Sequence, residues 1–318
     1  MTPARFTISH AGPQVTLQDA GRFGVLRYGV PASGPMDRMA FRVANLALGN
    51  APMTPAIEVS LGGLTLMCTQ GQVSFAVAGG SFQVAVDTQS LGPWSVATIK
   101  TGQTLTISRG RWGAWCYVAF AGQLQCHRWL GSASTHGPSG LGGGVLTTGQ
   151  CVQIDSPEFW PDRHGPLPVP VSARPRPRIR VVLGPQDRFF TAQTIKTLLA
   201  NPFTLTDACD RMGARLSGPP LPPVAALDIP SEPIVRGSIQ VAGDGVATVL
   251  LADHQTTGGY PKIATILSGD LDGFVQLRSR SYVMFEAITP QTAIAATRTR
   301  DKSRSDYLAQ IGRNLRKK

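Results

Sequence analysis

The sequence lacks any apolar run long enough to cross a bilayer, which takes about 20 uninterrupted residues. Its first residues, Met1–Arg5, lead directly into strand-like sequence and contain no apolar stretch of the kind that signal peptides carry. We therefore expect a cytoplasmic protein with no membrane segment.

Cysteine and histidine are sparse, and their spacing does not suggest a metal site. The five cysteines contain no CxxC pair, and with the five histidines they match no usual zinc spacing. The sequence also contains no HExxH, no GxxxxGK[ST] and no GxSxG. We expect no bound metal, reduced cysteines, and neither a P-loop nor a nucleophile elbow.

Charged and aromatic residues are few, at 15% and 7% of the chain, and yet the net charge is +11. Two short segments, Arg174–Arg180 and residues 298–318, account for ten of these positive charges. A groove for a polyanion requires basic residues spread over a folded face. Nucleic acid is therefore not an expected partner, and the two segments are interpreted as a solvated linker and tail.

Glycine, proline and short apolar runs are abundant. The 318 residues include 35 Gly and 25 Pro and are 42% hydrophobic, which predicts many short strands joined by tight turns. Helices are expected at 36–48 and 187–200, and a terminal amphipathic helix at Tyr307, Leu308, Ile311 and Leu315. We predict a mainly β protein with domains at 1–155 and 179–295, a proline-rich linker at 156–178 and a basic tail at 296–318.

Similar residues recur in the same order in the two halves. Thr16-Leu17, Asp19-Ala20 and Arg22 match Thr204-Leu205, Asp207-Ala208 and Arg211; Glu58 matches Glu232; and Tyr117-Val118-x-Phe120 matches Tyr282-Val283-x-Phe285. The preserved order indicates an internal duplication. Two equivalent modules commonly form a ligand cleft between them.

The segment richest in chemically active side chains is residues 250–265, LLADHQTTGGYPKIAT. Glycine N–H groups there can approach a ligand and stabilise a negatively charged oxygen, and Lys262 can neutralise an anion or relay a proton. The alternative is an ordinary Gly-Gly hairpin whose threonines cap the turn. The predicted catalytic residues are Lys262, Asp253 and Tyr260, and the predicted substrate-binding residues here are Gln255, Thr256, Thr257, Gly258 and Gly259.

Three further segments are candidates. Arg211 and Arg215 can hold an anionic ligand through forked hydrogen bonds, or can form internal salt bridges that brace a turn. Ser33 and Asp37 precede a predicted helix, where free N–H groups favour an anion, but each can instead cap the helix. The loop Gly131–Gly144 is rich in hydroxyls and glycine and can line a cleft or move as a lid.

Together these segments resemble the family of 5-oxoprolinase C subunits, also known as allophanate hydrolase subunit 2 or KipA-like proteins. The residues that carry the resemblance are Thr16–Arg22, Gly29–Asp37, Asn45-Leu46, Asp210–Gly213 and Asp253–Thr265, and the similarity spans about residues 5–290.

The resemblance implies two tandem cyclophilin-like β-barrel domains with flanking helices. It implies an enzyme subunit that works with a B-type (KipI-like) subunit and an A-type subunit in the ATP-dependent opening of 5-oxoproline, a cyclic amide, to glutamate. ATP is then a cofactor of the complex, and this subunit is expected to be inactive alone.

Two alternatives stay open. The first is the carboxyltransferase component of a biotin-dependent urea or amide carboxylase, with biotin supplied in trans because the chain contains no Met-Lys-Met attachment site. The second is a non-catalytic regulatory subunit that binds another protein such as a kinase.

Overall fold

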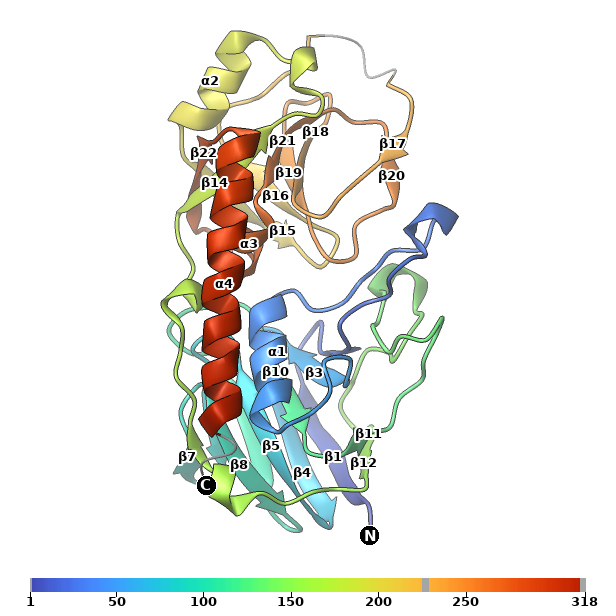
Figure 1. The fold of residues 1–318 in the computed structure, drawn as a ribbon. Coiled ribbons are helices and arrows are strands. Elements are labelled where there is room, and N and C mark those ends of the chain that lie inside the picture. The colour runs from blue at the N-terminus through green and yellow to red at the C-terminus, as the bar shows by residue number, and fades with distance from the viewer. Residues whose placement is uncertain (1, 225–228, 315–318) are drawn as a thin grey trace. The chain divides into compact units, whose positions relative to one another are not determined.

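The computed structural model describes residues 2–224 and 229–314. The chain forms two compact units (Figure 1). Unit 1 comprises the described residues of Met1–Arg22, Ser33–Arg174 and Arg304–Lys318, and unit 2 comprises those of Phe23–Ala32 and Pro175–Ser303. The proline-rich segment expected as a linker thus belongs to unit 1 as far as Arg174.

Unit 1 contains two β-sheets among its described residues. The seven strands of the first are, in spatial order, β11 (Gln123–Leu124), β12 (Cys151–Asp155), β1 (Ala4–Ala11), β4 (Leu64–Gln70), β9 (Thr104–Ser108), β6 (Gln83–Val86) and β7 (Gln89–Ser90). The six strands of the second are β13 (Gly165–Pro166), β8 (Ser95–Lys100), β5 (Gln72–Ala78), β10 (Cys116–Phe120), β3 (Ala56–Val59) and β2 (Thr16–Gln18). All their ladders are antiparallel.

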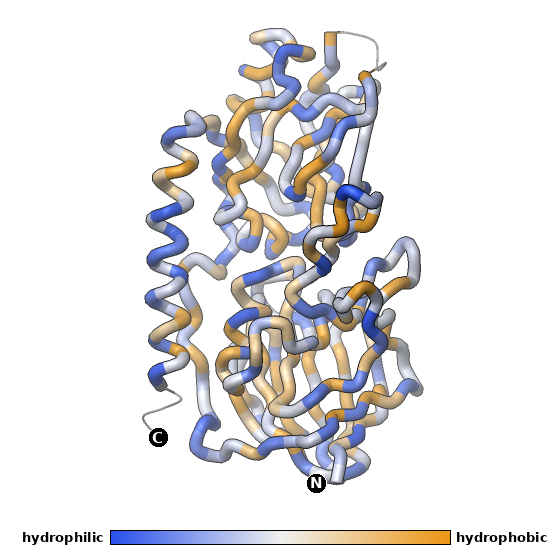
Figure 2. Tube along the Cα trace, turned by 45° about the vertical axis from the view of Figure 1, so that its right-hand side comes forward, coloured by the Kyte–Doolittle hydropathy of each residue, from blue (hydrophilic) through white to orange (hydrophobic). Residues whose placement is uncertain are grey.

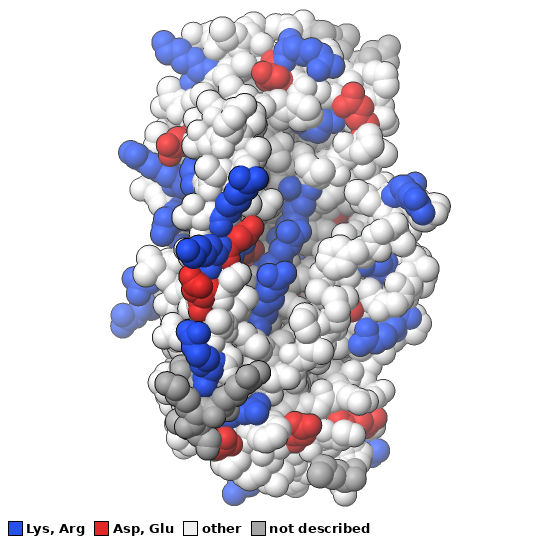
Figure 3. Space-filling model, in the orientation of Figure 1, with Lys and Arg blue, Asp and Glu red and all other residues white. Residues whose placement is uncertain are grey.

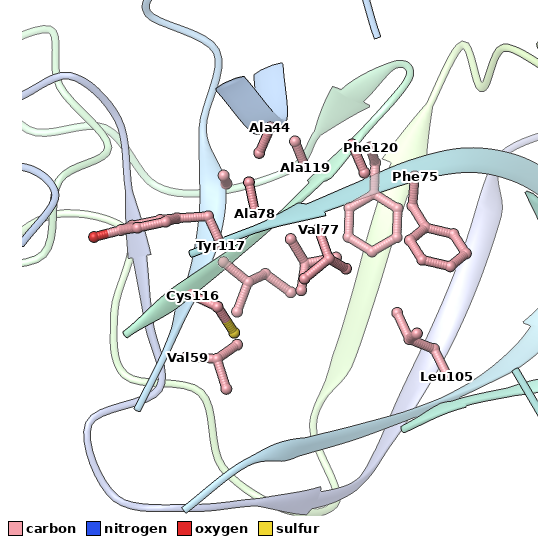
Figure 4. Packing of buried hydrophobic residues seen from close by; sticks show 14 of the residues in the cluster. Ala44, Val59, Phe75, Val77, Ala78, Leu105, Cys116, Tyr117, Ala119 and Phe120 are labelled. Carbon is pink, nitrogen blue, oxygen red and sulfur yellow. The ribbon is translucent and has the colours of Figure 1, made fainter. Parts of the chain in front are cut away.

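The core of unit 1 lies between these sheets. The ring centroids of Phe6 on β1 and Phe120 on β10 are 5.2 Å apart, so side chains of both sheets meet there. Leu105 of β9 and Phe75 of β5 belong to the same cluster (Figure 4). Helix α1 (Arg38–Ala47) packs on β5 and β10 and covers their second face. This explains why β10 is buried throughout and β5 at every residue but its first, whereas β4 alternates between buried and more exposed residues.

Unit 2 is built around a closed barrel. Its seven strands are, in order around the barrel, β14 (Arg178–Leu183), β21 (Lys262–Ile266), β18 (Ser238–Val241), β19 (Ala247–Leu250), β16 (Gly213–Ser217), β15 (Phe203–Cys209) and β22 (Tyr282–Ala287). The first and last strands of the barrel in chain order, β14 and β22, close it through a parallel ladder. A separate two-stranded ribbon is formed by β17 (Glu232–Pro233) and β20 (Thr257–Gly258). The prediction of a mainly β protein is confirmed.

The remaining helices of the described residues are α2 (Ala192–Ala200), α3 (Ser268–Phe274) and α4 (Pro290–Asn314), with short 3₁₀ turns η1 (Leu26–Tyr28), η2 (Gly137–Ser139), η3 (Pro161–Arg163), η4 (Val171–Ala173) and η5 (Asp187–Phe189). The helix expected at 187–200 is confirmed over Ala192–Ala200, but its first residues form the separate turn η5. The hydroxyl of Thr191 accepts a hydrogen bond from Thr194 N, and this N-cap starts α2 separately from the turn η5.

Helix α4 contains the predicted terminal helix and extends far beyond it. Tyr307 and Ile311 belong to unit 1, where Ile311 is buried in the core; Leu315 lies outside the described residues. The helix is mainly hydrophilic (Figure 2). Its Lys and Arg side chains are interspersed with acidic ones (Figure 3), so the basic charge of this segment is partly balanced locally.

The repeated residue pairs do not share the same strand neighbours. In unit 1, Thr16 and Tyr117 pair with Glu58 from opposite sides of β3. In unit 2, Thr204 and Tyr282 pair directly with each other. The residues that recur in sequence therefore do not occupy equivalent positions in the two sets of sheets.

Candidate active site

Lys262 is a lysine enclosed at the end of the barrel of unit 2. It opens β21 opposite Gln240 of β18, at the point where the register between these two strands shifts, and its side chain is buried there. Only 2% of the side chain is exposed. Its Nζ lies 3.5 Å from Oε2 of Glu232 and makes no hydrogen bond within the described part of the chain.

Gln186 holds both members of this ion pair in place. Its Oε1 accepts a hydrogen bond from Lys262 N at 3.0 Å, and its own N donates to Lys262 O at 3.1 Å. Its Nε2 donates to Glu232 Oε2 at 2.8 Å. Because Glu232 sits on β17 opposite Gly258 of β20, the same contacts connect the lysine to the Gly-Gly hairpin.

Arg211 and Asp253 form a second, fully buried ion pair. Arg211 Nε donates to Asp253 Oδ2 at 2.9 Å and Nη2 donates to Oδ1 at 2.8 Å. The two side chains are 6% and 0% exposed. Asp253 N also donates to Arg211 O at 2.7 Å. The guanidinium fork that was a candidate for a substrate carboxylate thus already holds one from the protein.

Arg215, Gln255 and Tyr260 line a pocket of about 340 Å³ on the outer side of the barrel. The Arg215 side chain is half-exposed and its Nη2 donates to Asp244 Oδ2 at 3.0 Å. Gln255 Nε2 donates to Gln240 Oε1 at 3.3 Å, and Gln240 Nε2 donates to Tyr260 O at 3.4 Å. Gln240, on β18, also pairs with Lys262 on the neighbouring strand β21. A residue of the pocket wall and the buried ammonium therefore lie on adjacent strands.

The hairpin before Lys262 has little room for side chains. A Cβ at Gly258 would lie 2.6 Å from Ile234 Cδ1 and 2.9 Å from Gln240 Nε2, so a larger residue would displace the ends of these two side chains. The carbonyl of Thr256 accepts a hydrogen bond from Ile234 N, and Thr257 pairs with Pro233. A Cβ at Gly259 would lie 3.0 Å from Ile229 O. Burial lowers the pKa of the neighbouring His254, whose Nδ1 lies 2.6 Å from Gln255 O.

Ser33 and Asp37 belong to unit 1, whereas the other candidate residues belong to unit 2. Asp37 caps α1, accepting a hydrogen bond from Ala40 N at 2.9 Å. Met36 N donates to Glu58 Oε2 at 2.8 Å. The protein's own carboxylates therefore occupy N–H groups that an external anion would use. Ser33 has φ 52°, is 6% exposed, and its Oγ has no hydrogen-bond partner among the described residues.

The hydroxyl-rich loop at 131–144 is an internal brace. Ser132 Oγ and Ser134 Oγ donate to Asp19 Oδ1 at 2.6 and 2.7 Å, and Ala133 N donates to Oδ2 at 2.7 Å. Thr135 Oγ1 donates to Leu17 O at 2.8 Å. Because these hydroxyls are buried and bonded to the chain itself, they do not line a cleft.

Sequence reasoning left Gln186, Glu232 and Gln240 out of the site. Glu232 is the sequence counterpart of Glu58, but that correspondence indicates no chemistry. Gln186 follows Gly184-Pro185 directly after a strand, a turn signal with no visible connection to Lys262, 76 residues away. Their involvement depends on barrel register, which no local pattern reveals.

The described residues contain neither a metal-binding cluster nor a membrane-spanning helix. No cluster of three or more His, Cys, Asp or Glu side chains there is arranged to hold a metal ion. None of the described helices combines the length and the hydropathy that crossing a bilayer takes.

Comparison with known proteins places the chain among proteins of one family. The chain is 34% identical to a Haemophilus influenzae protein named as the C subunit of 5-oxoprolinase, covering 94% of this chain and 95% of that protein. It is 31% identical to the Escherichia coli protein of the same name, covering 97% and 98%.

A solved structure shows the same fold. The K. lactis urea amidolyase superposes with a TM-score of 0.85 at 24% identity, covering 96% of this chain but only 20% of that much longer protein. The sequence profile described as "Carboxyltransferase domain, subdomain A and B" matches residues 28–287. The chain belongs to this family of carboxyltransferase domains with subdomains A and B.

Proposed function

We propose that this chain is the C-type subunit of an enzyme complex that opens the ring of 5-oxoproline to give glutamate, with hydrolysis of ATP and with B-type and A-type partner subunits. The observation that carries the proposal is the 34% identity with the C subunit of a 5-oxoprolinase over nearly the full length of both chains. ATP supplies the driving force for the reaction, and we assign no residue of this chain to the nucleotide.

The chemistry requires stabilisation of an anionic oxygen and delivery of a proton. Water adds to the lactam carbonyl, the C–N bond breaks, and the ring nitrogen becomes the amine of glutamate. A preorganised cation and backbone N–H groups in a dry site stabilise the oxyanion far better than water does. We assign the role of the cation to Lys262 and that of the backbone N–H groups to the Gly258-Gly259 turn.

Glu232 and Tyr260 complete the proposed site. The Glu232 side chain is 44% exposed and touches Lys262, so it provides a path for a proton between solvent and the ammonium. Tyr260 is 48% exposed beside Gln240 and Gln255, where it can contact a substrate. Arg215 is an exposed cation that a substrate carboxylate can reach, whereas Asp253 positions Arg211 and the turn before the hairpin.

The test is Lys262→Met in the reconstituted complex of all three subunits, since methionine preserves most of the side-chain volume. We expect ATP-dependent turnover of 5-oxoproline to fall ~10²–10³-fold, as when one oxyanion-stabilising group is lost. Lys196→Met, at an exposed position on α2, is the matched control. Unchanged turnover in a complex that assembles normally would remove Lys262 from the mechanism.

A carboxyltransferase acting on biotin supplied in trans is the second candidate. The family description that matches residues 28–287 favours it. Purification of the chain with its natural partners distinguishes the two, because only the carboxyltransferase requires a companion that avidin detects. A biotin-free complex active on 5-oxoproline supports the first proposal.

A further inference from the structure

Unit 1 contains a pocket of about 680 Å³ that the proposed function does not use. Its lining comes from β6 and β7, at one edge of the first sheet, and from β8 and β13, at one edge of the second. The turn after β8 and the segment 159–166 complete its wall. The volume is within the range of small-molecule sites in proteins.

The segment that closes this pocket is firmly held. Trp160 N donates to Ser74 Oγ at 2.8 Å, and Arg163 Nη1 donates to Leu48 O at 2.6 Å. The Arg163 guanidinium lies 4.0 Å from the centroid of the Trp160 ring. Gly165 and Pro166 add a short strand to β8. A wall fixed in this way needs little ordering when a ligand binds.

Hydrogen bonds also orient His164 at the pocket. Its Nε2 lies 2.6 Å from Thr98 Oγ1, and Thr98 Oγ1 lies 2.8 Å from Ser74 Oγ. The ring of Phe159 meets the His164 imidazole edge-on, with centroids 6.5 Å apart, and Phe159 is 46% exposed. The pocket thus has an exposed aromatic face next to a fixed imidazole.

The polar lining suits a ligand with many hydroxyl groups. Amides and hydroxyls both donate and accept hydrogen bonds, as the hydroxyls of a polyol do. The pocket presents the exposed amides of Gln72 and Gln89 and the exposed hydroxyl of Ser90. The other polar groups of the lining, from Gln103, Ser95 and Thr98, are hydrogen-bonded within the chain and fix the wall. The Phe159 ring offers a flat face with partial negative charge, against which the C–H groups of a sugar ring can pack.

The charge of the lining favours an anion. Lys100 is a lining residue, and no Asp or Glu of the described chain lines the pocket. The nearby Asp87 is bonded to Gln103 Nε2 at 3.1 Å and Thr104 N at 2.8 Å. We propose that this pocket binds a small polyhydroxylated molecule with one anionic group, either a sugar phosphate or a sugar acid.

Isothermal titration calorimetry with the full chain tests the proposal. The ligands are glucose 6-phosphate, glucuronate, neutral glucose and inorganic phosphate. We expect saturable binding of glucose 6-phosphate or glucuronate with a Kd of about 1 mM or tighter. Glucose and inorganic phosphate should each bind at least about tenfold more weakly than the charged sugar. Binding of only one charged polyol identifies the ligand as a sugar phosphate or a sugar acid.

Variants connect the binding to this pocket. We expect Lys100→Gln to weaken the charged polyol about tenfold without affecting glucose, and Phe159→Ala to weaken both. Lys196→Gln, in unit 2, is the control and should bind as the unmodified chain does. The proposal is overturned by absence of saturable binding of both charged polyols, by equal affinity for phosphate alone, or by unchanged affinity in Lys100→Gln.

Discussion

Lys262 and Glu232 form an ion pair whose two members differ sharply in exposure: the lysine side chain is 2% exposed and the glutamate side chain 44%, with 3.5 Å between Nζ and Oε2. Solvent therefore reaches the pair mainly through the carboxylate. The ammonium depends on this acidic partner for its charge balance, while Gln186 fixes the geometry of both.

Glu232→Gln should destabilise unit 2 more than Lys262→Met does. The first change leaves a buried ammonium without its counter-charge, which costs about 3–5 kcal/mol in a fully buried pair. Because Glu232 is partly solvated, we expect about 1–2 kcal/mol. Lys262→Met removes the buried charge itself and should cost less than about 1 kcal/mol. Urea unfolding of both variants and of the double variant measures the coupling; additive effects would show that the two groups do not interact.

Asp253→Ala should be strongly destabilising. It leaves the guanidinium of Arg211 buried without this carboxylate, and the expected loss is about 3–5 kcal/mol in the free energy of unfolding. Asp244→Ala is the matched control, because it breaks the half-exposed pair with Arg215 and should cost about 0–1 kcal/mol. Equal losses in chemical denaturation of the two variants would contradict this assignment.

Asp270 should make stability depend on pH at the acid end. Burial alone would raise its pKa, but hydrogen bonds and charge from Arg180, with the charge of Arg300, outweigh burial and lower the pKa. Its stabilising contribution is therefore fully present above its unfolded pKa of about 3.9, and is lost as pH falls through the lower folded pKa.

The comparison of the unmodified chain with Asp270→Asn isolates this contribution. The difference in free energy of unfolding should be constant at neutral pH and should shrink as the pH is lowered below about 4. Denaturant titrations at a series of pH values provide the measurement. A difference that stays constant down to the acid transition would rule out titration of Asp270 as its source.

Asp37→Ala should destabilise α1 by about 1–2 kcal/mol, because the Asp37 carboxylate caps the helix through Ala40 N. Thr191→Ala removes the corresponding cap of α2 and serves as a comparison of similar kind. Thermal unfolding measures the loss of stability, and amide hydrogen exchange in α1 shows where the helix opens. Faster exchange confined to the first turn supports capping, and unaltered exchange there refutes it.

The sequence was informative wherever a signal is local. Helix α1 begins at an Asp cap and ends before Gly49, and both features can be recognised within a few residues. The apolar runs of β5 and β10 likewise predicted buried strands. The resemblance to known carboxyltransferase proteins supplied the family, and the mainly β architecture followed.

What the sequence did not reveal depends on contacts between distant residues. The pairing of Arg211 with Asp253 spans 42 positions, and that of Gln186 with Lys262 spans 76. Both follow from the register of the barrel strands, which sequence patterns do not determine. The same reason explains why the repeated pairs looked equivalent in sequence and yet have different strand neighbours.

The parallel ladder between β14 and β22 has a consequence for biosynthesis. These strands begin and end the barrel in chain order, and β22 ends only at Ala287. Contacts between residues roughly 100 positions apart form slowly, because the intervening chain must first be brought together. The barrel therefore cannot close on the ribosome until β22, its last strand in chain order, has been translated. We expect arrested nascent chains that stop before residue 282 to expose the apolar lining of β18 and β19 to chaperones.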